Sequence, residues 1–225
     1  ILTGLYPVHH GVRDDGLFPL GESQHTLAEA LHAAGYHTAA FVSSFQLDSR
    51  YGFAQGFDIY DQQMTNRRPY RAQLGGLANR PANLTVDAAI QWLEARNQAA
   101  LPAPFFAWVH FVDAQTPYTS PAPHLSAYPK KPYLGALAFI DEELKRLLGS
   151  LRQQPDQENT LIVLAGTHGE GLFDHAEENH SYLLYDTTTS VPLIWSWPAK
   201  LGAPRVLDQG PAGTVCPKVG ASGKI

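Results

Sequence analysis

The chain has 225 residues, of which 44% are hydrophobic, so it can bury a sizeable core and is not a wholly disordered polypeptide. Its 16 Lys and Arg are outnumbered by 21 Asp and Glu and form no basic run, which argues against nucleic-acid binding. No apolar run approaches the ~20 residues of a membrane-spanning helix. The single cysteine excludes an internal disulfide and a cysteine-based zinc cluster.

The first half of the chain predicts one helix followed by one strand. Residues 26–29 (TLAE) have the form of a capping box, in which a hydroxyl and a carboxylate each accept a backbone N–H. We expect a helix from there to Ala34, ended by Gly35, and then a buried strand over 37–42. This order is typical of an α/β unit. Residues 44–83 are broken by glycine and proline and predict an irregular segment.

The second half predicts two helices and three strands. Apolar stripes indicate helices over 85–97 and 133–151, and the proline-rich residues 114–132 between them predict a rigid loop. Continuous apolar runs, typical of strands covered on both faces, lie at 105–111, 160–165 and 191–196.

Polar residues follow these strands at the carboxyl ends, where open parallel sheets bind their ligands. Ser43 and Ser44 follow one strand, and His110, Asp113 and Gln115 follow another, so we expect them to share one rim of the sheet. For His110, hydrogen bonding within the core and a place in the pocket explain its position equally well.

The segment 166–180 combines three histidines with four carboxylates directly after a strand, which suits a metal or an acid–base site. Gly169 and Gly171 allow a close backbone approach, and His168 is the strongest candidate because it follows the strand between two glycines. A solvated acidic loop is the alternative interpretation. The histidines and carboxylates of the segment are His168, Glu170, Asp174, His175, Glu177, Glu178 and His180.

Several sequence blocks resemble the sulfatase family of the alkaline phosphatase superfamily over about residues 1–200. Residues 2–4 resemble the last three residues of the family signature Cys/Ser-x-Pro-Ser-Arg-x-x-x-Leu-Thr-Gly. The blocks are residues 2–4 (LTG), 6–7 (YP), 10–14 (HGVRD), 35–42 (GYHTAAFV), 56–58 (GFD), 104–106 (PFF), 116–118 (TPY), 167–171 (THGEG), 174–175 (DH), 184–186 (LYD) and 191–194 (VPLI).

The resemblance implies an α/β fold like that of alkaline phosphatase, with a mostly parallel mixed sheet between helix layers. We expect this domain, incomplete, over residues 1–202, followed by an irregular, disordered tail over 203–225. The resemblance also implies hydrolysis of sulfate esters by a formylglycine nucleophile with a divalent metal, usually Ca²⁺. We expect the formylglycine to lie upstream of Ile1, and therefore expect this chain alone to be inactive.

The resemblance assigns metal-binding positions to Thr167 and His168. Thr167 stands where relatives carry Asp, and its neutral hydroxyl should weaken the affinity for a hard dication. Gln115 stands where relatives carry His, and its amide can hydrogen-bond a sulfate oxygen but cannot donate a proton at neutral pH. His180 lies where many relatives carry His or Lys beside the substrate, and we expect His180 and Gln115 to be the catalytic pair.

Arg13 and His110 are expected to bind the substrate, although a turn salt bridge with Asp14 or Asp15 explains Arg13 equally well. The implied substrate is a small-molecule or glycan sulfate ester, and relatives are often exported, which favours a periplasmic or secreted protein. Two alternatives remain open. One is a degenerate relative that binds an anion or a partner without catalysis, and the other is a phosphodiesterase or phosphonate hydrolase of the same superfamily.

Overall fold

A computed structural model describes residues 1–14, 18–64, 79–99, 103–118, 120–180 and 182–201. The chain divides into two compact units, the first formed by Ile1–Leu151 and the second beginning at Arg152. Each unit is described by itself. The tail 203–225, for which the sequence predicts irregular structure, lies outside the described residues.

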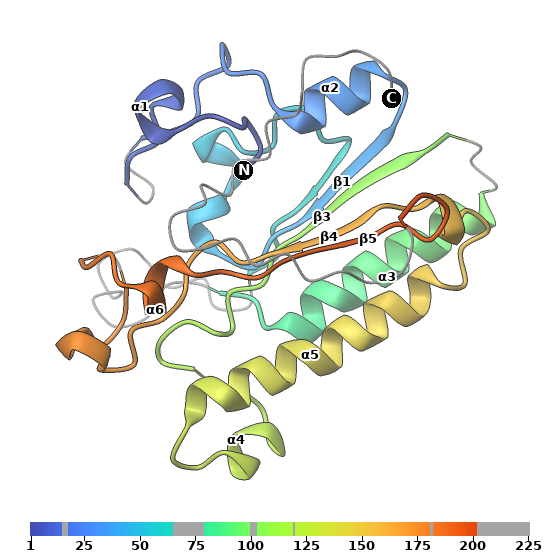
Figure 1. The fold of residues 1–225 in the computed structure, drawn as a ribbon. Helices are drawn as coiled ribbons and strands as arrows, with labels where there is room; N and C mark the ends of the chain where they lie inside the picture. Colours follow the sequence, from blue (N-terminus) through green and yellow to red (C-terminus); the bar gives the residue numbers. More distant parts are fainter. Residues whose placement is uncertain (15–17, 65–78, 100–102, 119, 181, 202–225) are drawn as a thin grey trace. The chain divides into compact units, whose positions relative to one another are not determined.

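The first unit is built on a three-stranded parallel sheet in the order β2-β1-β3 (Figure 1). The central strand β1 (His37–Phe41) pairs with β2 (Ile59–Asp61) on one side and with β3 (Phe105–Val109) on the other. Strands β1 and β3 confirm the predicted apolar strands. Strand β2 falls in the segment 44–83, where the sequence predicts irregular structure, because its three residues are too few to show a pattern.

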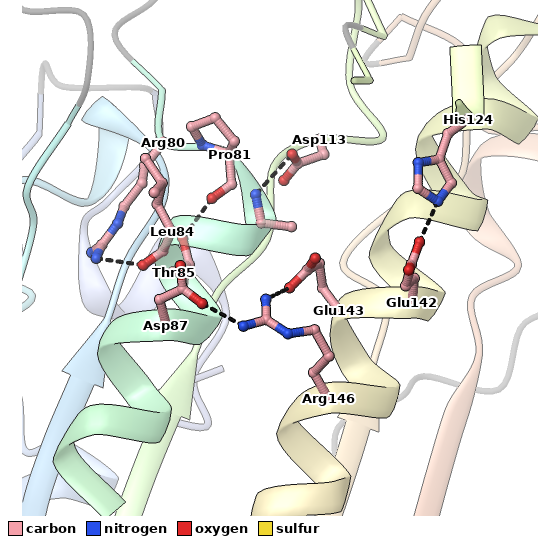
Figure 2. Close-up of polar contacts among 11 residues, drawn as sticks. Arg80, Pro81, Leu84, Thr85, Asp87, Asp113, His124, Glu142, Glu143 and Arg146 are labelled. Atoms are coloured by element: carbon pink, nitrogen blue, oxygen red, sulfur yellow. Dashed lines mark hydrogen bonds and ion pairs between the residues drawn. The ribbon is translucent and has the colours of Figure 1, made fainter. Parts of the chain in front are cut away.

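Two long helices, α3 (Ala82–Gln98) and α5 (Pro132–Leu151), confirm the apolar stripes and pack together on one face of this sheet (Figure 1). Apolar side chains from β1 and both helices form the core. Arg146 of α5 also donates to Asp87 of α3 at 2.6 Å (Figure 2). The buried core residues are Ala39, Phe41, Val86, Ala89, Leu93 and Leu147.

Helix α2 (Leu27–Ala33) contacts β1 and begins with the predicted capping box. The Thr26 hydroxyl accepts the Glu29 N–H at 3.1 Å, and the Glu29 carboxylate accepts the Thr26 N–H at 2.8 Å. Both bonds join residues three apart in the chain, so the start of this helix is encoded locally.

The remaining helices are short. The proline-rich segment expected to be a loop contains α4 (His124–Ala127), whose His124 Nε2 lies 2.7 Å from Glu142 of α5 (Figure 2). The other short elements are the helices α1 (Pro7–His10) and α6 (Asp186–Thr189) and the 3₁₀ turns Phe45–Leu47, Ser49–Tyr51, Gln157–Asn159 and Asp174–Ala176.

The second unit contains a two-stranded antiparallel sheet made by β4 (Ile162–Ala165) and β5 (Leu193–Ser196). Both strands lie where the sequence predicts them. Their side chains are less covered than the continuous apolar runs predict, since Val163 is 47% and Ile194 is 54% exposed. Among the described helices of both units, none has the length and apolar character needed to cross a bilayer.

Gly56 gives a test of how tightly the loop before β2 packs on α2. Its φ is +81°, and a Cβ atom there would lie 2.2 Å from the Glu29 nitrogen. Gly35 has a similar φ of +86° but open space around it. Alanine at either position is strained by the positive φ. Only Gly56→Ala also brings a side chain too close to the backbone of Glu29. It should therefore destabilise the fold by about 1–3 kcal/mol more than Gly35→Ala. Urea unfolding of the two variants measures this difference, and equal losses would contradict the packing described.

Candidate active site

The carboxyl edge of the sheet in the first unit brings Ser43 and His110 together. Ser43 follows β1, His110 follows β3, and Ser43 Oγ lies 3.0 Å from His110 Nδ1. Ser43 is fully buried, and burial lowers the pKa of His110 to about 4, so the imidazole is neutral at neutral pH. The structure thus shows the hydrogen bond expected for His110, and the residue also keeps part of its surface exposed.

Asp113, further along the loop after β3, caps the long helix α3. Its Oδ1 accepts the backbone N–H of Ala82 at 2.9 Å, at the positive end of the helix dipole (Figure 2). Its second oxygen is buried and has no hydrogen-bond partner among the residues that the structure describes, and burial raises the pKa of this carboxyl group. The loop that carries Gln115 is therefore attached to α3 through Asp113.

The carboxyl edge of the same sheet also holds a buried ion pair that the sequence does not predict. Arg80, just before α3, donates to Asp61 at the end of β2 at 2.7 Å, and both side chains are largely buried. Arg80 also donates through its guanidinium to the Leu84 carbonyl and through its backbone N–H to the Ser43 carbonyl. With these partners its role is to hold the segment before α3 against the ends of β1 and β2.

The other two candidates in the first unit stand apart from this network. Arg13 is exposed, and within the described part of the chain it forms no ion pair; Asp15 lies outside the described residues. Gln115 is partly exposed, and its backbone is held in a turn by bonds with Val112 and Tyr118. Neither side chain is committed to a described partner, so each remains available to a ligand.

In the second unit the segment 166–180 brings two of the predicted histidines together. The rings of His168 and His180 stack with their centroids 3.8 Å apart. His180 Nδ1 lies 3.0 Å from Oε1 of Glu170, whose side chain is only 2% exposed. This contact is an imidazole held by a buried carboxylate, which is the arrangement used in general acid–base catalysis.

Close backbone contacts fold this segment, as the two glycines predict. A Cβ on Gly169 would lie 2.0 Å from the Thr187 carbonyl oxygen, and one on Gly171 would lie 2.5 Å from that of Glu177. The buried Glu177 carboxylate accepts the Tyr182 N–H at 2.9 Å and thereby holds the end of the loop. The segment is thus a folded structure with a buried centre, which goes against the interpretation as a wholly solvated loop.

The described residues do not fit a Ca²⁺ site. Calcium takes six to eight oxygen ligands, with carboxylates among them. Thr167 and His168 are both exposed, and His168 Nδ1 is directed at the Gly169 carbonyl at 2.9 Å. No group of three or more His, Cys, Asp or Glu side chains arranged to hold a metal occurs among the described residues. Thr167 and His168 alone cannot surround a hard dication.

Glu170 is a candidate functional residue that the sequence does not single out. Its position two residues after His168 marks it only as one of four carboxylates in the segment. A buried carboxylate needs a partner, and the ten-residue separation from His180 becomes a contact only because the loop folds back. Glu177 is buried as well, so the contact with His180 is what separates Glu170 from the other carboxylates of the segment, and the sequence does not show it.

The lowered pKa of His110 predicts a loss of stability in acid. Between pH 6.5 and pH 4 the unfolded chain binds a proton that the folded chain does not, so stability falls as the pH drops through this window. A shift from 6.5 to about 4 corresponds to roughly 3 kcal/mol. In urea unfolding at several pH values, His110→Asn should remove this part of the pH dependence. A variant and a wild type that lose stability in parallel from pH 6.5 to pH 4 would contradict the assignment.

Comparison with known proteins identifies the family. Residues 1–212 match the family model described as Sulfatase. A protein named sulfatase from Formosa agariphila is 35% identical over 66 residues, which are 29% of this chain and 13% of that protein.

Solved structures share the fold at low sequence identity. The protein yidJ from Bacteroides fragilis, named as a sulfatase, has a TM-score of 0.70 and 16% identity over 89% of this chain and 57% of its own. Phosphonate monoester hydrolase of Agrobacterium radiobacter has a TM-score of 0.65 and 19% identity over 88% of this chain and 57% of its own. A protein solved with its substrate, D-glucosamine-2-N,6-O-disulfate, has a TM-score of 0.63 and 18% identity over 88% of this chain and 60% of its own.

These likenesses confirm the α/β fold of the alkaline phosphatase superfamily. The chain spans less than two thirds of each relative named above. The family model nevertheless covers nearly all of this chain, and the chain belongs to the sulfatase family.

Proposed function

We propose that the protein hydrolyses sulfate esters and that His180 protonates the leaving oxygen. The observation that supports this is the 3.0 Å contact between His180 Nδ1 and the buried Glu170 carboxylate. The carboxylate accepts the Nδ1–H of the ring, so Nε2 is the nitrogen that exchanges a proton with a ligand. His180 keeps 17% of its side chain exposed, which leaves it accessible to a ligand.

The reaction breaks the bond between sulfur and the alcohol oxygen of the ester. Without a proton this oxygen leaves as an alkoxide, which is costly for a sugar or alkyl alcohol. Transfer of the Nε2 proton of His180 as the bond breaks yields the neutral alcohol. The group that attacks sulfur remains, within this proposal, the formylglycine that the resemblance implies upstream of Ile1.

Within the first unit the proposal gives substrate binding to Arg13, His110 and Gln115. The exposed guanidinium of Arg13 can donate two parallel hydrogen bonds to an anionic group. The Gln115 amide can donate to a sulfate oxygen without a proton transfer, and the neutral His110 can do the same through a ring N–H. Gln115 assists catalysis in this proposal by holding the anion.

The proposed substrates are small-molecule or glycan sulfate esters. The relative solved with D-glucosamine-2-N,6-O-disulfate supports this class, because its fold accepts a sulfated sugar. The similarity to a phosphonate monoester hydrolase makes phosphonate monoesters the competing ester class.

A second candidate is a non-catalytic relative that binds an anion or a partner. Thr167 and Gln115 favour it, since each stands where the resemblance expects an ionisable residue and neither carries a charge. The buried Glu170 carboxylate favours the enzyme, because anion binding alone gives no reason to hold a proton on His180.

The role of His180 predicts a dependence on the leaving group. In the natural polypeptide that contains this chain, His180→Ala should lower kcat for an alkyl sulfate by about 100-fold or more. For 4-nitrophenyl sulfate, whose phenolate leaves without a proton, the loss should be much smaller. Glu170→Gln should act in the same direction and less strongly, since it retains the shape but not the charge. Steady-state kinetics on both sulfate esters, repeated with the phosphonate monoester 4-nitrophenyl phenylphosphonate, measure these effects.

His25→Ala serves as the control because His25 is exposed and contacts neither the Ser43–His110 pair nor the Glu170–His180 pair. Equal losses of His180→Ala on both sulfate esters would remove the proton-donor role. Binding of aryl sulfate without turnover would support the non-catalytic relative, and faster turnover of the phosphonate than of either sulfate would shift the function to that ester class.

A further inference from the structure

We propose that Ser43 is a positioning residue that fixes His110 as a neutral hydrogen-bond donor through Nε2, and that this donor favours singly charged esters over dianionic phosphate monoesters. The inference rests on the proposed function, in which His110 contacts the substrate anion. It adds the tautomer and charge of the His110 imidazole, the residue that sets the tautomer, and the effect of both on substrate choice.

Both residues are held by their backbones at neighbouring strand ends. The His110 N–H donates to the Phe41 carbonyl at 3.0 Å, which extends the pairing of β1 and β3 by one bond. The Ser43 carbonyl accepts the Arg80 N–H at 2.9 Å. With both backbones fixed, the 3.0 Å contact between Ser43 Oγ and His110 Nδ1 is part of the sheet edge.

The surroundings of Ser43 decide which imidazole nitrogen carries the proton. Ser43 is 0% exposed, and among the described residues His110 is the only side-chain partner of its hydroxyl. A proton on Nδ1 would be donated to Oγ and would leave the hydroxyl hydrogen buried without an acceptor, at a cost of about 1–3 kcal/mol. When Nδ1 is bare, the hydroxyl donates to it and the ring proton sits on Nε2. The buried serine therefore selects the Nε2–H tautomer.

The same surroundings keep the imidazole uncharged. His110 forms no ion pair within the described part of the chain, and burial alone accounts for its lowered pKa. A buried imidazole without a carboxylate lacks the partner that would stabilise an imidazolium. His110 thus differs from His180, which faces the Glu170 carboxylate.

The charge state has a consequence for selectivity. A cationic donor attracts a dianion more strongly than a monoanion, because the Coulomb energy scales with the product of the charges. A neutral N–H donates one hydrogen bond to either anion and adds little to this difference. A sulfate monoester carries one negative charge and a phosphate monoester carries two near neutral pH, so a neutral His110 avoids favouring phosphate.

Nuclear magnetic resonance of the chain with ¹⁵N-labelled histidine tests the tautomer directly. Long-range ¹H–¹⁵N spectra should show His110 protonated on Nε2 in the wild type and in Ser43→Thr, which keeps the hydroxyl. Ser43→Ala should lose this preference. A wild-type His110 protonated on Nδ1, or a folded Ser43→Ala variant with an unchanged tautomer, overturns the proposal. The wild-type spectrum decides the first point even if the alanine variant does not fold.

Titration with phenyl sulfate and phenyl phosphate tests the selectivity. We expect His110→Lys to tighten the binding of phenyl phosphate relative to phenyl sulfate by about tenfold. This factor is the difference between a charged and a neutral hydrogen bond. An unchanged ratio in a variant that still binds overturns the selectivity. If the wild type shows the expected tautomer but binds neither ester, the failure lies with the proposed function, and the role of Ser43 in setting the tautomer stands.

Discussion

A polar side chain that leaves water needs a partner inside the protein, and this constraint organises both units of the chain. Ser43 and His110 meet across 67 residues of sequence, and Glu170 and His180 meet across ten. In each pair one member is almost completely buried, so the pair fixes the imidazole as well as the backbone that carries it. In each unit, the candidate functional residues are therefore held by contacts that also stabilise the fold of that unit.

The parts of the fold that sequence predicts are those encoded by neighbouring residues. The capping box at 26–29, the stripes of α3 and α5 and the apolar runs of the strands all depend on local spacing. Strand β2 depends on pairing with β1, and α4 forms within a segment whose prolines predict a loop, so neither has a local signature. The same limit explains the exposed strands β4 and β5, because an apolar run does not specify what covers it.

The candidate site was predictable in residue type but not in contacts. Sequence places His110 after a strand and His168 and His180 in one short segment, and the structure agrees. It cannot show that Glu170 rather than a neighbouring carboxylate is buried beside His180, because that choice depends on how the loop turns. For the same reason it cannot show that Ser43 sets the tautomer of His110, since only burial makes an unpaired hydroxyl costly.

Charge connects the two histidine environments with the chemistry proposed for the chain. His110 is kept neutral by burial, and the positions of Thr167 and Gln115 hold uncharged groups where the resemblance expects ionisable ones. A neutral donor gives up much of the extra attraction that a charged donor has for a dianion over a monoanion. Of His110, His168 and His180, His180 is the one whose ring contacts a carboxylate in the described structure, which suits a group that must carry a proton. In the proposed function, the neutral His110 of the first unit suits a singly charged ester, and the carboxylate-supported His180 of the second unit suits an ester whose leaving alcohol needs a proton.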